Sequence, residues 1–169
     1  MPALFALLLL LCAAPLLQAD SIALGSPVPQ LTLPDQDGKA VDLGVALAHG
    51  WTLVYFYPKA DTPGCTTEAC RFRDSFAALQ AKGIGIFGVS SDPVPVLKKF
   101  QTGKNLPFPL LSDADRALAN AFGVPAFPGT LIDKRQSFLV KDGVVVWRDL
   151  DVDPATVVGR TLDAVEAIK

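Results

Sequence analysis

The stretch TLVYFYPKADTPGCTTEAC, residues 52–70, decides the fold. Its first six residues, TLVYFY, are a continuous apolar, aromatic and β-branched run, which is typical of a strand buried on both faces. Helical periodicity begins after Thr62, because Pro63 suits a first helical position and Thr62 suits the cap before it. A buried strand that leads directly into a helix predicts a βα unit.

The rest of the chain predicts more elements of both kinds. The first helix is expected to end at Gly83, and IGIFGVS, residues 84–90, is expected to form a second buried strand. Hairpins are predicted at two Asp-Gly pairs, and three later helices complete the pattern. The hairpins lie at Asp37-Gly38 and Asp142-Gly143, and the later helices run from Asp92-Pro93 to about Gln101, from Ser112 to Gly123, and from Asp153-Pro154 onward. This order indicates an α/β, thioredoxin-like fold with a central mixed β-sheet flanked by helices and an N-terminal β-hairpin.

Composition is that of a folded domain with no nucleic-acid partner. Half of the 169 residues are hydrophobic, 19% are charged, and the formal net charge is −2. A chain of this size and hydrophobic content can bury one good core. The slightly acidic balance gives no basic patch, so a nucleic-acid partner is not expected.

The first nineteen residues, MPALFALLLLLCAAPLLQA, contain no charged side chain and are rich in Leu and Ala. This composition predicts a signal peptide over residues 1–19, cleaved after Ala19, and a single domain over residues 20–169. We therefore expect an exported, periplasmic protein with no membrane contact after cleavage. An uncleaved membrane anchor is the alternative, because the apolar run approaches spanning length. Lipidation of Cys12 is disfavoured by Leu11, which stands where a small residue is expected.

Removal of the leader leaves two cysteines, Cys65 and Cys70. Their spacing matches neither a redox C-x-x-C motif nor a zinc knuckle, and His49 is the chain's one histidine, so a metal site is not expected. Cys65 falls in the first turn of the predicted helix. Unpaired backbone N–H groups and the positive end of the helix dipole favour a thiolate there.

The two cysteines cannot form a disulfide while this helix is intact. Cys65 lies on the apolar stripe of the helix, whereas Cys70 points away from it. Positions five apart on a helix are separated by about 8 to 9 Å between Cα atoms, and a disulfide requires less than about 7 Å. A bond between them would require the first turns to unwind, which suits a disulfide that forms and is reduced in each catalytic cycle. A permanent structural disulfide is the alternative.

The segment YFYPKADTPGCTTEACRFRD contains the pattern Pro58-x-x-x-Thr62-x-x-Cys65, which resembles the active-site segment of peroxiredoxins. With Cys70 five residues further on, it resembles the peroxiredoxin Q or bacterioferritin comigratory protein subfamily. The LPDQDGK hairpin and the RQSFLV strand extend the resemblance over nearly all of the chain from Ser26.

The resemblance implies a thiol peroxidase. Cys65 would be the peroxidatic nucleophile that becomes a sulfenic acid, and Cys70 would resolve it as an intramolecular disulfide. Thr62 would hydrogen-bond the thiolate and the peroxide, and Pro58 would shield the pocket from water. The family also has an arginine beside the thiolate, for which Arg135 in the R-x-S-F-L pattern is the candidate.

Other residues near the motif have open roles. Arg71 and Arg73 compete with Arg135 by their closeness in sequence to the cysteines. Glu68 either orients Arg135 or only stabilises the helix end as a first-turn acid, and we leave it outside the site. Tyr57 is expected to be a buried strand residue, and the alternative is that it borders the pocket.

The expected partners are a hydroperoxide substrate and a thioredoxin-like or other dithiol reductant, with no metal, haem or flavin and with a monomeric state. Two other functions remain open at this point. One is a thiol-disulfide oxidoreductase that acts on protein partners, since a fold alone does not decide function. The other is a non-enzymatic exported domain with a structural disulfide.

Overall fold

The structure, a computed structural model, describes residues 20–168. The predicted signal peptide, including Cys12, lies outside the described residues. Within them, no helix is both long and apolar enough to span a membrane.

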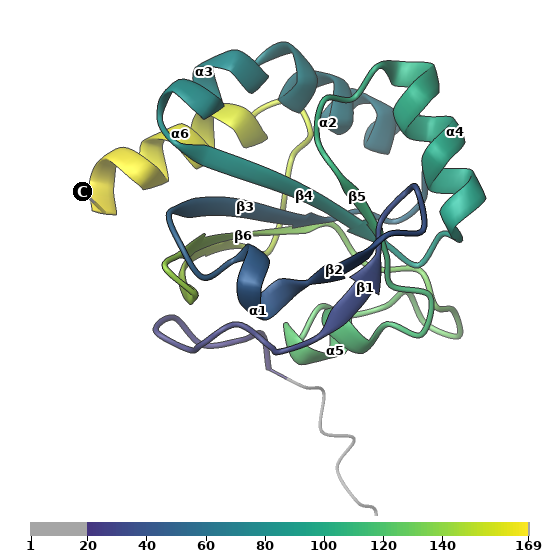
Figure 1. The fold of residues 1–169 in the computed structure, drawn as a ribbon, viewed down its shortest axis with the longest axis horizontal. Helices are drawn as coiled ribbons and strands as arrows, with labels where there is room; N and C mark the ends of the chain where they lie inside the picture. Colours follow the sequence, from purple (N-terminus) through teal and green to yellow (C-terminus); the bar gives the residue numbers. More distant parts are fainter. Residues whose placement is uncertain (1–19, 169) are drawn as a thin grey trace, which may run out of the picture.

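A mixed five-stranded sheet forms the centre of the molecule, with the strand order β5-β4-β3-β6-β7 (Figure 1). Its strands are β3 (Trp51–Phe56), β4 (Ile84–Ser90), β5 (Leu110–Ser112), β6 (Gln136–Lys141) and β7 (Val144–Asp149). The pairs β3·β4 and β4·β5 are parallel, and β6 is antiparallel to both β3 and β7. Two short antiparallel strands, β1 (Thr32–Pro34) and β2 (Ala40–Asp42), form a separate hairpin. The predicted mixed sheet and both predicted hairpins are confirmed.

Helices cover both faces of the sheet (Figure 1). The helices are α1 (Leu43–Ala46), α2 (Pro63–Asp74), α3 (Phe76–Ala81), α4 (Val94–Lys104), α5 (Ala117–Ala121) and α6 (Val157–Ile168). Figure 1 shows α2, α3, α4 and α6 on one face, and α1, α5 and the β1–β2 hairpin on the other. Alternation along β3 supplies a core to each side: Tyr55 packs toward the first group, and Phe56 packs toward the second. The strand is therefore buried on both faces, as its composition predicts.

Several helix boundaries differ from the prediction, and one of them is the end of α4, which continues to Lys104 instead of stopping near Gln101. The helix after β3 is interrupted at Ser75, whose backbone (φ −100°, ψ 4°) leaves the helical region, so α2 and α3 are separate. The helix expected from Ser112 begins only at Ala117, because Arg116 before it has a left-handed backbone. The last helix begins at Val157, since Asp153 and the residues after it form a turn in which its carboxylate accepts the Ala155 N–H.

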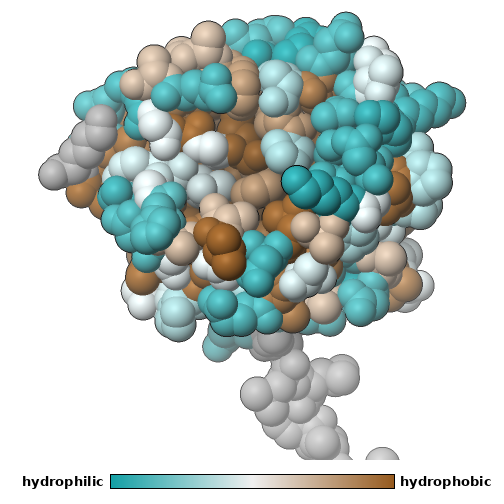
Figure 2. Space-filling view, in the orientation of Figure 1, coloured by the Kyte–Doolittle hydropathy of each residue, from teal (hydrophilic) through white to brown (hydrophobic). Residues whose placement is uncertain are grey.

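The first half of β4, residues 84–87, is an edge of the sheet, because β5 is short and pairs only with Gly88–Ser90. Apolar side chains gather around this edge, where a shallow hollow is lined in part by Phe76, Phe87 and Phe108. Figure 2 shows hydrophobic residues in the middle of this view and hydrophilic residues over α4. The edge is thus bordered by side chains rather than by a further strand of the described chain.

Two glycines on β4 provide a matched test of the packing between the sheet and the helices α2, α3, α4 and α6. A Cβ atom on Gly88 would lie 2.7 Å from the side chains of Tyr55 and Leu110, both of which are fully buried. On Gly85 the nearest atom would be 3.5 Å away, an ordinary contact. We expect Gly88→Ala to lower the free energy of unfolding by about 1–3 kcal/mol through overpacking. Gly85→Ala is the control, and equal effects of the two variants in urea denaturation would contradict this packing.

Candidate active site

The loop that follows β3 sets the start of α2. Thr62 is the N-cap residue with an extended backbone (φ −83°, ψ 155°), and Pro63 occupies the first helical turn, as predicted. The Thr62 side chain makes no capping bond, and its hydroxyl instead donates to the carbonyl oxygen of Lys59 at 2.9 Å. Pro58 is half-buried two residues after the end of β3. Cys65 therefore lies in the first turn of α2, where backbone N–H groups are free of helical partners.

Sheet register brings Arg135 to this cysteine from 70 positions away. Phe56 at the end of β3 pairs with Gln136 at the start of β6, so the residue before β6 lies beside the loop after β3. The Cys65 side chain is buried, with 2% exposure, and an Arg135 Nη2–H group donates to its Sγ at 3.3 Å. The arrangement places a fixed positive charge against the sulfur.

Glu68 holds the other side of the same guanidinium. Its side chain is fully buried one helical turn after Cys65, and Oε2 forms an ion pair with Nη1 of Arg135. Burial raises the pKa of Glu68 to about 7; Arg135 opposes this shift, and the charge of Asp149 adds to it. Burial alone would lower the pKa of Arg135, but Glu68 and the Cys65 sulfur outweigh it, so that its pKa is raised. Arg135 thus bridges two groups on one face of α2.

Glu68 is the residue that the sequence prediction left out. The available signal was its spacing from Cys65, because positions i and i+3 share a helix face. The alternative, a first-turn acid that only stabilises the helix end, is wrong, because α2 begins at Pro63 and its first turn holds no acidic residue. The contact with Arg135, which depends on the sheet, gives Glu68 its buried position beside the guanidinium.

Gly64 leaves room for the guanidinium. A Cβ atom at this position would lie 3.2 Å from Nη2 of Arg135, closer than side chains ordinarily pack. The missing side chain therefore lets Arg135 approach the first turn of α2.

Cys70 lies on the same helix, half-buried, and both thiols are free in the structure. Because α2 is unbroken between them, the two Cα atoms are about 8 to 9 Å apart by helix geometry. Arg73 bonds to Asp74 and to the carbonyl oxygen of Lys104, and Arg71 is exposed. Of the three candidate arginines, Arg135 is the one that the structure places against Cys65.

Buried polar groups hold the loop before α2 in place beside Cys65. Asp92, just after β4, accepts the Ala60 N–H at 2.7 Å and the Ser90 hydroxyl at 3.0 Å, which ties the loop before α2 to the sheet. Tyr55 and Tyr57 are fully buried with ring centroids 5.5 Å apart, and burial raises the pKa of both. Tyr57 is therefore buried, as predicted, but it lies one residue beyond the end of β3 rather than in the strand.

The chemistry of the arrangement is that of an activated sulfur nucleophile. A buried sulfur at a helix N-terminus, in contact with a guanidinium, is placed where a nucleophile is stabilised by positive charge. The described residues contain no group of three or more His, Cys, Asp or Glu positioned to hold a metal ion.

The raised pKa of Glu68 makes stability depend on pH. The folded state favours the protonated acid, so its contribution is full below the ordinary value of 4.5 and is lost as pH rises through about 7. Relative to a Glu68→Gln variant, the wild-type free energy of unfolding should fall by up to about 3 kcal/mol across this window. Urea denaturation at several pH values measures the difference. A difference that is constant with pH would show that Glu68 titrates normally.

Comparison with known proteins identifies the family. Residues 24–148 match the model of the AhpC/TSA family. Peroxiredoxin Q of rice (Oryza sativa subsp. japonica) is 38% identical over 149 residues, which cover 87% of this chain and 68% of the relative. Peroxiredoxin Bcp of Escherichia coli is 42% identical over 121 residues, which cover 69% of this chain and 77% of the relative.

Solved structures agree with the sequence matches. The bacterioferritin comigratory protein of Xanthomonas campestris, studied for its alkyl peroxide reduction activity, superposes with a TM-score of 0.78 at 33% identity. The match covers 88% of this chain and 98% of that protein. The chain therefore belongs to the AhpC/TSA family and is a peroxiredoxin of the peroxiredoxin Q/Bcp type.

Proposed function

We propose that Cys65 is the peroxidatic residue of this peroxiredoxin and that Cys70 resolves it. Family membership makes the chain a thiol-dependent peroxidase. The contact between the Arg135 guanidinium and the buried Cys65 sulfur is the observation that supports the finer assignment. Cys70 is half-buried on the same helix, and its charged neighbour among the described residues is Arg73, whose pKa is raised first by a hydrogen bond to Asp74 and then, without a hydrogen bond, by Cys70.

In the first step the Cys65 thiolate attacks the terminal oxygen of a hydroperoxide. The S–O bond forms as the O–O bond breaks, the sulfur is oxidised by two electrons, and the leaving alkoxide or hydroxide takes a proton from solvent. Arg135 would stabilise the thiolate and the charge that develops on the departing oxygen. The Thr62 hydroxyl, which donates to Lys59, keeps lone pairs that can accept the peroxide O–H. Pro58 would limit the access of water.

In the second step the Cys70 thiol attacks the Cys65 sulfenic acid. A disulfide forms and water leaves, taking up the thiol proton. Because the cysteines are too far apart on intact α2, the turn between them must unwind first. Sulfenic acid formation favours this change, since the neutral product has lost the charge that attracts Arg135. An external dithiol then reduces the disulfide and restores both thiols.

The composition of residues 1–19 supports export of the enzyme to a periplasm. A thioredoxin-like reductant in that compartment and a monomeric state complete the proposal, and both rest on the likeness to peroxiredoxins of the Q/Bcp type. N-terminal sequencing of the protein recovered from cells tests this proposal. A chain that begins at Asp20 would support it, and a chain that retains the leader would contradict cleavage.

Single-turnover kinetics test the two cysteine roles. We expect reduced wild type to show a rapid change in Trp fluorescence on mixing with hydrogen peroxide. Cys65→Ser should abolish the change, whereas Cys70→Ser should stop at a sulfenic acid that dimedone traps. Cys12→Ser in the full chain is the control and should react like wild type. Full turnover by Cys65→Ser, or a Cys70→Ser variant that still forms the intramolecular disulfide, would refute the assignment.

A further inference from the structure

Arg135 is carried into the site by a hairpin over residues 125–134. The base of the hairpin is closed by the Lys134 N–H, which donates to the carbonyl oxygen of Pro125 at 2.8 Å. Arg135 is the next residue after this closing bond. Any movement of the hairpin base therefore moves the backbone from which the Arg135 side chain extends.

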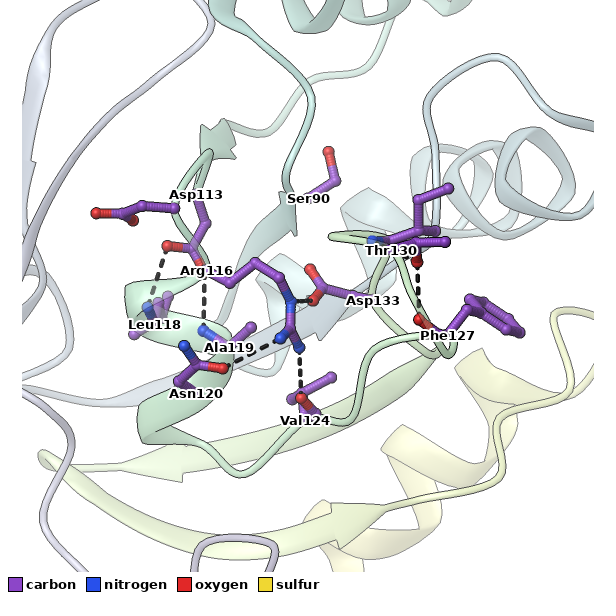
Figure 3. A network of polar contacts seen from close by, with 12 residues as sticks. Ser90, Asp113, Arg116, Leu118, Ala119, Asn120, Val124, Phe127, Thr130 and Asp133 are labelled. Carbon is purple, nitrogen blue, oxygen red and sulfur yellow. Dashed lines mark hydrogen bonds and ion pairs between the residues drawn. The ribbon is translucent and has the colours of Figure 1, made fainter. Parts of the chain in front are cut away.

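One arginine holds both strands of the hairpin base (Figure 3). Arg116 donates from Nε to Oδ1 of Asp133 at 2.7 Å and from Nη2 to the carbonyl oxygen of Val124 at 2.7 Å. Val124 precedes the hairpin, and Asp133 lies two residues before Arg135. A third bond, from Nη1, reaches the Asn120 side chain at 3.1 Å. The planar guanidinium thus ties the start of the hairpin to its end.

The arginine is itself anchored to the central sheet. Asp113 is fully buried; its N–H donates to the carbonyl oxygen of Ser90 at the end of β4, and its carboxylate accepts the N–H groups of Leu118 and Ala119 in α5 (Figure 3). The Arg116 N–H donates to the carbonyl oxygen of Asp113 at 2.9 Å, and α5 begins at the next residue. A continuous set of polar contacts therefore runs from β4 through Asp113 and Arg116 to Asp133, which precedes Lys134.

The ion pair between Arg116 and Asp133 forms despite two unfavourable features, a strained backbone at Arg116 and a buried carboxylate at Asp133. Arg116 has a left-handed backbone (φ 59°, ψ 29°), which non-glycine residues seldom adopt. The Asp133 carboxylate is fully buried, and its Oδ2 has no hydrogen-bond partner within residues 20–168. Burial raises the pKa of Asp133 to about 6, against the effect of Arg116 and with a smaller contribution from Asp113. Strain and burial of this kind persist where the surrounding structure requires them.

We propose that the Arg116–Asp133 pair is a positioning clasp, which holds Arg135 against Cys65 and thereby sets the rate at which Cys65 reacts. Arg116 and Asp133 do not touch the sulfur; they act through the hairpin base and Arg135. The kinetic consequence rests on the proposed role of Cys65.

The test compares variants that open the clasp without removing Arg135. Asp133→Asn removes the charge at nearly constant size, and Arg116→Gly removes the guanidinium while suiting the left-handed backbone. Val145→Ala, which shortens a fully buried side chain of β7, serves as the control for general loss of stability. The readouts are the single-turnover rate with hydrogen peroxide, alkylation of the Cys65 peptide by iodoacetamide at mildly acid pH, and thermal unfolding.

We expect both clasp variants to slow peroxide reaction by about 10- to 100-fold, the scale of effect that a small misplacement of a catalytic group produces. Alkylation of Cys65 should slow as well, while Val145→Ala leaves both rates at the wild-type value. In an Arg135→Ala background, Asp133→Asn should add little, because its effect passes through Arg135. Clasp variants that unfold at lower temperature but react at wild-type rates would overturn the proposal, as would fully additive effects of Asp133→Asn and Arg135→Ala.

The alkylation readout separates this proposal from the proposed function. If wild type failed to react with peroxide, the function assigned to Cys65 would fall. Slower alkylation of Cys65 in Asp133→Asn and Arg116→Gly would still support the clasp, and unchanged alkylation would refute it. Should Asp133→Asn not fold, Arg116→Lys retains the charge but loses the fork, and is expected to slow both reactions.

Discussion

The contact between the Arg135 guanidinium and the Cys65 sulfur is the interaction on which the site depends. It joins a helix N-terminus to the residue before an antiparallel strand, and both positions are fixed by the register of β3 against β6. A shift of one residue in that register would turn every β6 side chain to the opposite face. The chemistry of the cysteine is thus tied to the pairing of strands distant in sequence.

Arg135 also couples reactivity to the integrity of α2. It bridges Cys65 and Glu68, one helical turn apart, and so supports the turn that would have to open in the proposed cycle before Cys70 could reach Cys65. Its hold on the sulfur is electrostatic, and the proposed oxidation of Cys65 to a neutral sulfenic acid would weaken it. The same interaction can therefore favour an intact helix in the reduced enzyme and permit local unwinding after oxidation.

Much of this architecture was accessible from sequence. The buried run TLVYFY, the Asp-Gly hairpins and the P-x-x-x-T-x-x-C pattern predict the fold and the family because each depends on local spacing. Long-range contacts set the features that were not predicted. Glu68 becomes a buried partner only because Arg135, the residue before β6, reaches it, and the helix expected from Ser112 begins late because Ser112 ends β5 and Arg116 has a left-handed backbone. Neither periodicity nor composition reports such contacts.

The Arg135→Lys variant gives the most direct test of the central claim. Lysine keeps the positive charge but lacks the fork that contacts Glu68 and Cys65 together. The measurement is the second-order rate of sulfenic acid formation with hydrogen peroxide, compared with wild type in stopped flow. The account predicts a loss of about 100-fold or more. A rate within about threefold of wild type in a folded variant would contradict it, because the charge alone would then suffice.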